Sequence, residues 1–336
     1  MKAVIPTAGE GTRLYPHTHT KPKPMVRVAG KPILGHILSK LARTSVDSVV
    51  LVVGGRMQTQ VIDYAEAAFG DRFELTFVEQ ETPEGLGHSI YQAEPVARGD
   101  DLLIALGDML FQRGYREFLE AHASLETADA SIGVKRVAEP QHYGIASVSD
   151  GRVTGLVEKP DDPESNLAIS GVYIVEDSEG LFDALAHLVE NDIRGAGNEY
   201  QLTDALARMV DQGATIRTFE VEDWYDCGRP ETLLEANRVL LDDIDTDGAA
   251  DATETVVREP VDIGDDVTIE GSVVGPYVSI DDGATVVDSI LRDGIVGRDS
   301  TLRTVNLAES IIGDNSTVTG STNHLNVGDN STLDFS

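Results

Sequence analysis

Cysteine, lysine and long apolar runs are scarce in this sequence of 336 residues. Its single cysteine, Cys227, excludes an internal disulfide and any zinc site built from several cysteines. No apolar run approaches the roughly 20 residues with which a helix spans a bilayer. The N-terminus also lacks the succession of basic region, apolar stretch and cleavage site that marks a signal peptide. We therefore expect a cytoplasmic protein with no membrane segment.

Positive charge is scarce as well, since 26 Lys and Arg face 58 Asp and Glu, for a formal net charge of −32. A surface this acidic repels nucleic acids, so we expect no nucleic-acid partner. It is typical of adaptation to high salt, where charges are screened beyond about 3 Å at 1 M. Only seven basic residues are lysines, and Lys21, Lys23 and Lys159 fall in the motifs described below.

Residues 1–241 alternate short β-branched runs with longer amphipathic segments, which predicts an α/β domain with a mixed, mainly parallel sheet. The predicted strands are 2–6, 48–53, 73–78, 102–106, 130–136, 144–148, 153–158, 168–175 and 215–221. The predicted helices are 32–43, 57–69, 88–95, 115–125, 181–190, 201–212 and 231–241.

The chain changes character after residue 241. Residues 242–255 are rich in Asp, Ala, Thr and Gly, which predicts a linker. Residues 256–336 repeat an aliphatic residue followed by glycine, and most pairs open six-residue units such as IGDDVT and VGRDST. The pairs are Ile263-Gly264, Val274-Gly275, Val296-Gly297, Ile312-Gly313 and Val327-Gly328. This pattern favours a hexapeptide-repeat parallel β-helix over short strands in a sandwich.

A glycine loop follows the first predicted strand and contains Ala8, Gly9, Gly11, Thr12 and Arg13. A strand, a glycine loop and a following helix form the usual frame of a phosphate site, because exposed backbone amides donate to oxyanions. An arginine in such a loop can grip phosphate oxygens with two parallel hydrogen bonds. The dinucleotide-binding alternative requires a third glycine, and Leu14 stands at its position.

This loop opens the run GEGTRLYPHTHTKPKPMVRVAGKPI, which resembles the signature of the sugar-1-phosphate nucleotidyltransferases. The family's motifs continue in order as VEQETPEGLGHS, LGDM, YGIASV, LVEKP, NLAISGVYIV, EYQLTDAL and WYDCGRPETLLEAN. With the repeats, nearly the whole chain is similar to the long form of glucose-1-phosphate thymidylyltransferase. The resemblance implies a Rossmann-like catalytic domain, a left-handed β-helix, Mg²⁺, and transfer from dTTP or UTP to a sugar 1-phosphate, with glucose favoured.

The resemblance also implies roles for individual residues. Asp108 and Asp226 would bind Mg²⁺, which prefers carboxylates, although a lone aspartate after a strand often caps a helix. Arg13 and Lys23 would hold the triphosphate and stabilise the departing pyrophosphate. The implied base-recognition residues are Gln80, Pro83, Gly85 and His88, and His88 is also open to a packing role. The implied sugar-phosphate residues are Gly144, Glu158, Lys159, Asn166, Ile169 and Gly171.

Departures from the family pattern leave the nucleotide open. The loop is preceded by Ile5-Pro6-Thr7, and Met109 stands where thymidylyltransferases commonly have asparagine, so the choice between dTTP and UTP is undecided.

Two other functions compete. The repeats are also typical of acyl-coenzyme A-dependent acetyltransferases, which generally use a histidine base, but His324 is the only histidine after residue 256. A non-catalytic scaffold would be expected to lose the loop arginine, the lysine or a metal carboxylate, and this chain keeps them all. We expect the β-helix to support a homo-oligomer, because its flat faces and open end suit association with a neighbour.

Overall fold

The computed structural model of the chain describes residues 1–9, 11–222, 224–243 and 254–322. They form two compact units, Met1–Ala236 and Asn237–Ser336, with the boundary inside α8 (Pro230–Asp242). Most of the predicted linker, and the pair Val327-Gly328, lie outside the described residues. No helix in the described ranges is long and apolar enough to cross a membrane.

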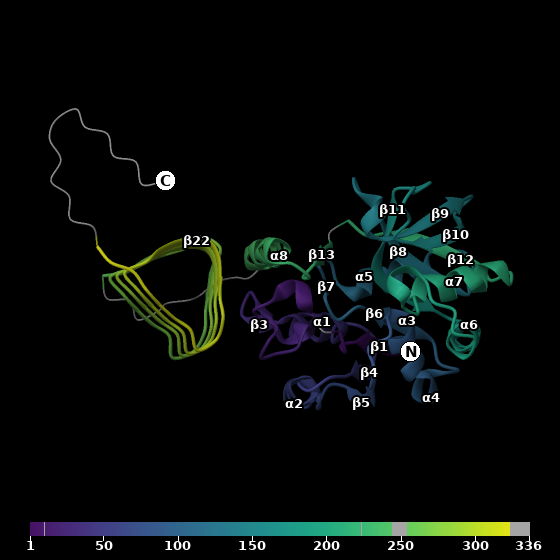
Figure 1. Cartoon of the computed structure of the whole chain (residues 1–336), viewed down its shortest axis with the longest axis horizontal. Helices are drawn as coiled ribbons and strands as arrows, with labels where there is room; N and C mark the ends of the chain where they lie inside the picture. The colour runs from purple at the N-terminus through teal and green to yellow at the C-terminus, as the bar shows by residue number, and fades with distance from the viewer. Residues whose placement is uncertain (10, 223, 244–253, 323–336) are drawn as a thin grey trace. The chain divides into compact units, whose positions relative to one another are not determined.

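The first unit is built on a nine-stranded sheet with the order β5-β4-β1-β6-β11-β8-β12-β10-β9 (Figure 1). The strands are β1 (Lys2–Pro6), β4 (Ser48–Val53), β5 (Glu74–Glu79), β6 (Leu102–Ala105), β8 (Ala130–Arg136), β9 (Gly144–Ser149), β10 (Arg152–Glu158), β11 (Leu167–Val175) and β12 (Ile216–Glu220). Strands β5, β4, β1 and β6 are parallel, as are β8 and β12. The sheet is less parallel than predicted, because the long β11 enters antiparallel between β6 and β8.

Helices cover the sheet and close its core. They are α1 (Ile33–Leu41), α2 (Gln58–Phe69), α3 (Leu86–Gln92), α4 (Glu94–Ala97), α5 (Tyr115–Ala123), α6 (Ser178–Glu190) and α7 (Leu202–Asp211). Apolar residues of α3, α6 and α7, among them Ile90, Phe182 and Leu206, pack in one cluster with Val4 and Ile104 of the central strands. Burial of each such side chain stabilises the fold by about 1.5–3 kcal/mol.

Four short strands of the first unit were not predicted. A two-residue pair joins β2 (Arg27–Val28) to β3 (Lys31–Pro32), and an antiparallel ribbon joins β7 (Met109–Phe111) to β13 (Trp224–Asp226). In this ribbon Asp226 lies opposite Met109, and the backbone N–H of Cys227 donates to the carbonyl of Asp108 at 3.0 Å. The ribbon therefore brings residues 108 and 226 side by side.

The second unit is a parallel β-helix whose coils trace a three-sided outline (Figure 1). Its strands are β14 (Val256–Val257), β15 (Val261–Ile263), β16 (Thr268–Glu270), β17 (Val273–Val274), β18 (Val278–Ile280), β19 (Thr285–Val287), β20 (Ile290–Val296), β21 (Thr301–Arg303), β22 (Asn306–Ile312) and β23 (Thr317–Thr319). Val261, Val278, Gly294 and Ser310 stack in register on successive coils. The inward aliphatic residues, such as Ile269, form a separate core, as the repeats predicted.

Candidate active site

A cavity of about 580 Å³ opens in the first unit, next to the carboxyl ends of the parallel strands β1 and β6. Ligands of open α/β sheets bind at such ends. The predicted residues that line it are Ala8, Gly9, Gly11, Thr12, Arg13, Lys23, Gln80, Pro83, Gly85, Asp108, Glu158 and Lys159. Segments far apart in the sequence therefore meet around one space.

The glycine loop forms one wall and takes its shape from Gly11. This residue has φ 64°, and a Cβ there would lie 2.9 Å from Cβ of Lys23, so a side chain would displace the lysine. The hydroxyl of Thr18 donates to the Gly11 carbonyl at 2.8 Å and fixes the turn. The loop is followed by a 3-10 turn, Thr12–Leu14, and not by the helix that is usual at phosphate sites, because Pro16 favours an extended conformation at Tyr15.

Lys23 joins the two predicted metal carboxylates. Its Nζ donates to Oδ2 of Asp108 at 2.6 Å and lies 3.6 Å from Oδ1 of Asp226. The lysine side chain is only 9% exposed, whereas the aspartate side chains are 34% and 33% exposed. Nearby, burial raises the pKa of the Cys227 thiol, which stays protonated and is no candidate nucleophile. The site thus offers one ammonium and two partly solvated carboxylates.

These carboxylates fit a magnesium-like cation. Within the described ranges no three His, Cys, Asp or Glu side chains converge to form a complete protein cage. Mg²⁺ rarely uses such a cage, because it keeps several waters and commonly binds one or two carboxylates together with substrate phosphates. Asp108 and Asp226, adjacent through Lys23 and partly open to solvent, supply that donor set.

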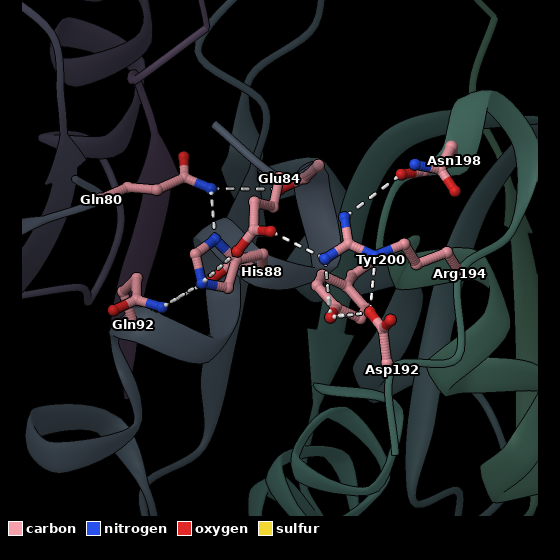
Figure 2. Close-up of polar contacts among 9 residues, drawn as sticks. Gln80, Glu84, His88, Gln92, Asp192, Arg194, Asn198 and Tyr200 are labelled. Atoms are coloured by element: carbon pink, nitrogen blue, oxygen red, sulfur yellow. Dashed lines mark hydrogen bonds and ion pairs between the residues drawn. The ribbon is translucent and has the colours of Figure 1, made fainter. Parts of the chain in front are cut away.

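The base-recognition segment forms a second wall. Gln80 is buried, and its amide nitrogen donates to the carbonyl of Gly85 at 3.3 Å and to Nδ1 of His88 at 3.0 Å. The other ring nitrogen of His88 lies 2.9 Å from the amide nitrogen of Gln92 (Figure 2). His88 is not among the residues that line the cavity. It therefore lies behind Gln80 and orients its amide, which matches the packing role left open above.

Arg194 ties this segment to the loop that precedes α7. Its guanidinium donates to Glu84 at 2.8 Å, to Asp192 at 2.7 Å and to the Tyr200 hydroxyl at 3.0 Å (Figure 2). The backbones are joined too, since the N–H of Tyr200 donates to the Glu84 carbonyl at 2.8 Å. The Tyr200 and Arg194 hydrogen bonds lower the pKa of Asp192. This cluster holds the base-recognition segment against the loop that contributes Glu199 and Gln201 to the cavity lining.

Glu158 and Lys159 form the third wall. Oε2 of Glu158 accepts from the hydroxyl of Thr203 at 2.7 Å, and Oε1 lies 3.4 Å from Nζ of Lys159. Gly144 lies directly behind this carboxylate, since a Cβ there would be 2.7 Å from Oε2 of Glu158 and 3.1 Å from Cδ1 of Ile169. The structure thus gathers four of the predicted sugar-phosphate residues.

Only Glu158 and Lys159 of the six line the cavity itself, since Gly144 and Ile169 lie behind the Glu158 carboxylate and the remaining two residues lie elsewhere. Gly171 packs behind the wall, where a Cβ would lie 2.9 Å from Cδ1 of Leu106 and 3.1 Å from Cγ of Met109. Asn166 lines a different hollow and accepts a hydrogen bond from Arg136 at 2.9 Å. Its part in sugar binding stays a prediction that the cavity does not support.

Several cavity residues were not predicted, namely Ser89, Gly107, Glu199, Gln201 and Gly228. Among them, Gly228 is the residue at which charged side chains leave the least room for a Cβ. A Cβ there would lie 2.7 Å from Oδ1 of Asp226, 3.1 Å from Nζ of Lys23 and 3.3 Å from the guanidinium of Arg13. The available signal was its place two residues after Asp226, in the WYDCG motif.

Comparison with known proteins places this site in a family. Residues 2–243 match the family model described as nucleotidyl transferase. The chain belongs to the nucleotidyl transferase family. Among relatives of this nucleotidyltransferase, the low-salt glycan biosynthesis nucleotidyltransferase Agl11 of Haloferax volcanii is 33% identical, over 93% of this chain and 92% of that protein.

Two further matches extend the comparison. Glucose-1-phosphate thymidylyltransferase of Streptomyces antibioticus is 32% identical, over 96% of this chain and 94% of that protein. A crystal structure of UDP-glucose pyrophosphorylase complexed with UDP-glucose has a TM-score of 0.61 at 25% identity, over 72% of this chain and 99% of that chain. The predicted family and the fold of the catalytic domain are thus confirmed.

Proposed function

We propose that this nucleotidyltransferase transfers a nucleotidyl group from dTTP or UTP to a sugar 1-phosphate, with glucose 1-phosphate favoured, and releases pyrophosphate. The observation that carries the proposal is the meeting of Lys23 and Asp108 with the glycine loop in the lining of one cavity, with Asp226, which is not itself a lining residue, 3.6 Å from the Lys23 ammonium. The names of the relatives support the sugar phosphate and both nucleotides, because one acts as a glucose-1-phosphate thymidylyltransferase and another was solved with UDP-glucose.

In the proposed reaction a phosphate oxygen of the sugar 1-phosphate attacks the α-phosphorus of the nucleotide. The bond between the α-phosphorus and the oxygen bridging to the β-phosphate breaks, and its electron pair leaves with pyrophosphate. The attacking oxygen is already anionic, so the step needs positioning and charge neutralisation, not a general base.

The chain's residues divide this work. The loop amides and Arg13 hold the triphosphate, and Lys23 neutralises charge that develops on the leaving pyrophosphate. Lys159 binds the sugar phosphate, and Glu158 accepts hydrogen bonds from ring hydroxyls. Asp108 and Asp226 would hold Mg²⁺, which supplies further neutralisation of the phosphate oxygens.

A pyrophosphate-release screen tests the proposal by crossing dTTP, UTP and GTP with several sugar 1-phosphates, at low and at molar salt. We expect turnover with dTTP, UTP or both, dependent on Mg²⁺. Asp108→Asn should lower kcat at least about a hundredfold, because it removes charge from the metal site. Asp71→Asn, at an exposed position, is the matched control. Full turnover by Asp108→Asn, or release of coenzyme A in place of pyrophosphate, would refute the proposal.

A further inference from the structure

Lys40 is one of only seven lysines in the chain, and it binds backbone that is distant from it in the sequence. It lies half-buried in the last turn of α1, where lysines commonly bind the final carbonyls of their own helix. Here Nζ donates to the carbonyl of Phe111, to that of Gln112 at 2.7 Å and to that of Arg113 at 3.4 Å. An ammonium has three N–H donors, so the end of β7 and the turn after it wrap around this one group.

The strand that Lys40 binds belongs to a ribbon outside the main sheet. Strands β7 and β13 form a two-stranded sheet of their own, and such a pair is only marginally stable alone. Phe111 lies opposite Trp224 at one end of the ribbon, and Met109 lies opposite Asp226 at the other end. Contacts with the rest of the unit must therefore fix where the ribbon lies, and α1 lies beside β7.

The two predicted metal carboxylates lie at the end of the ribbon that is away from Lys40. Asp108 directly precedes β7, and its carbonyl accepts from the N–H of Cys227, which directly follows β13, at 3.0 Å. Asp108 and Phe111 are three residues apart, which is about 10 Å of extended chain. A rotation of the ribbon at Phe111 is therefore carried to Asp108 and Asp226, because the two strands are paired along their whole length.

A second anchor holds the carboxylate end, but a bound cation weakens it. Lys23 donates to Asp108 at 2.6 Å and lies 3.6 Å from Asp226. A divalent cation on the same carboxylates repels the ammonium, since like charges at such distances disfavour each other. In the proposed reaction Lys23 also faces the leaving pyrophosphate. Lys40 binds backbone carbonyls at the other end, so its hold on the ribbon persists when the cation binds.

We propose that Lys40 is a positioning residue for the metal site. By binding three backbone carbonyls at one end of the ribbon, its ammonium holds Asp108 and Asp226 at the other end in the arrangement that one divalent cation requires. The inference rests on the proposed function and deepens it, because it names what fixes the two carboxylates. Lys40 acts through the ribbon and not by contact with substrate, since it is not among the residues that line the cavity.

Hydrogen exchange of the ligand-free protein tests the anchoring directly. Lys40→Met keeps the apolar stem and removes the ammonium. We expect the amides of β7, β13 and Cys227 to exchange about 3- to 30-fold faster, the range for a residue that acts through its neighbours, with exchange in the main sheet unchanged. Lys2→Met is the matched control, because Lys2 lies on β1, donates to the Val96 carbonyl at 2.6 Å and pairs with Asp100 at 2.8 Å. It should leave exchange in the ribbon at the wild-type rate.

The Mg²⁺ dependence of pyrophosphate release tests the consequence for the metal site. In Lys40→Met the free Mg²⁺ concentration for half-maximal turnover should rise about 3- to 30-fold, and saturating Mg²⁺ should restore most of kcat. A merely destabilised enzyme would lose kcat at every Mg²⁺ concentration. Lys40→Gln keeps an amide donor and is taken through the same two measurements if Lys40→Met does not fold.

The outcomes separate this inference from the proposed function. An unchanged exchange rate in the ribbon, an unchanged Mg²⁺ requirement, or an equal rise in Lys2→Met would overturn the assignment of Lys40. Failure of the wild type to release pyrophosphate with any of the nucleotides refutes the proposed function itself. The exchange measurement needs neither metal nor substrate, so it still decides whether Lys40 holds the ribbon.

Discussion

Thr203 holds Glu158 in place, and its removal should weaken sugar-phosphate binding selectively. The threonine is buried at the start of α7, and its hydroxyl donates to Oε2 of Glu158 at 2.7 Å. The change Thr203→Val keeps the shape and removes the donor. A hydrogen bond to a charged group contributes about 1.5–3 kcal/mol. If Glu158 must be held for the sugar to bind, kcat/KM for the sugar 1-phosphate should fall about 10- to 100-fold.

Steady-state pyrophosphate release, with one substrate varied and the other saturating, measures this effect. The KM for the nucleotide should stay within about twofold, because the Thr203 hydroxyl donates to Glu158 of the sugar-phosphate wall. Thr154→Val is the matched control, since that hydroxyl donates to the Ser147 carbonyl at 3.2 Å on the same strand as Glu158. An unchanged sugar-phosphate KM in Thr203→Val, or equal losses for both substrates, would refute the assignment of Glu158 to the sugar.

Three further predictions concern other parts of the first unit. Gly228→Ala should abolish most turnover without loss of folding, because its Cβ would lie 2.7 Å from Oδ1 of Asp226; normal kcat with a normal circular dichroism spectrum would contradict this. Arg194→Ala should raise the KM for the nucleotide more than the KM for the sugar 1-phosphate, because the hydrogen bond to Glu84 is lost. Steady-state kinetics with each substrate varied in turn measures both KM values, and equal changes would contradict the prediction. Burial lowers the pKa of His36 from 6.5 to about 4. The unfolded chain therefore takes up the proton first, and stability should fall between pH 6.5 and 4 by about 3 kcal/mol in total. His36→Gln should remove this part of the pH dependence in urea unfolding, and an unchanged slope would count against it.

Regular elements were predictable from the sequence where apolar periodicity is strong. All nine strands of the main sheet match their predicted ranges within about two residues. Helix α3 was predicted from residue 88 but begins at Leu86, because Gly85 and Gly87 read as a loop. The N–H of Gly87 finds its partner in the Tyr200 carbonyl at 2.7 Å, which local sequence cannot show. The helix ends at Gln92, and Pro95 is the second residue of the next helix, α4 (Glu94–Ala97).

The site was predictable only in part, because much of it is formed by contacts between segments that are distant in the sequence. The glycine loop was visible from residue chemistry, whereas the pairing of Asp108 with Asp226 came from family resemblance alone. The three-residue strands β7 and β13 that bring these residues together are too short to show a period. Gly228 had only its place in the WYDCG motif as a signal, because its contacts with Lys23 and Arg13 join segments distant in the sequence.

The charge distribution is compatible with the polyanionic substrates proposed for so acidic a chain. The net charge is −32, yet the cavity gathers Arg13, Lys23 and Lys159 from three separate segments. At molar salt the acidic surface is screened beyond about 3 Å and no longer repels an approaching nucleotide. A cation that touches a phosphate inside the cavity is closer than the screening length and keeps most of its attraction. Affinity for the proposed substrates should therefore depend on these few local contacts and not on the net charge of the whole protein. For the same reason a loop lysine in a lysine-poor chain is informative about function.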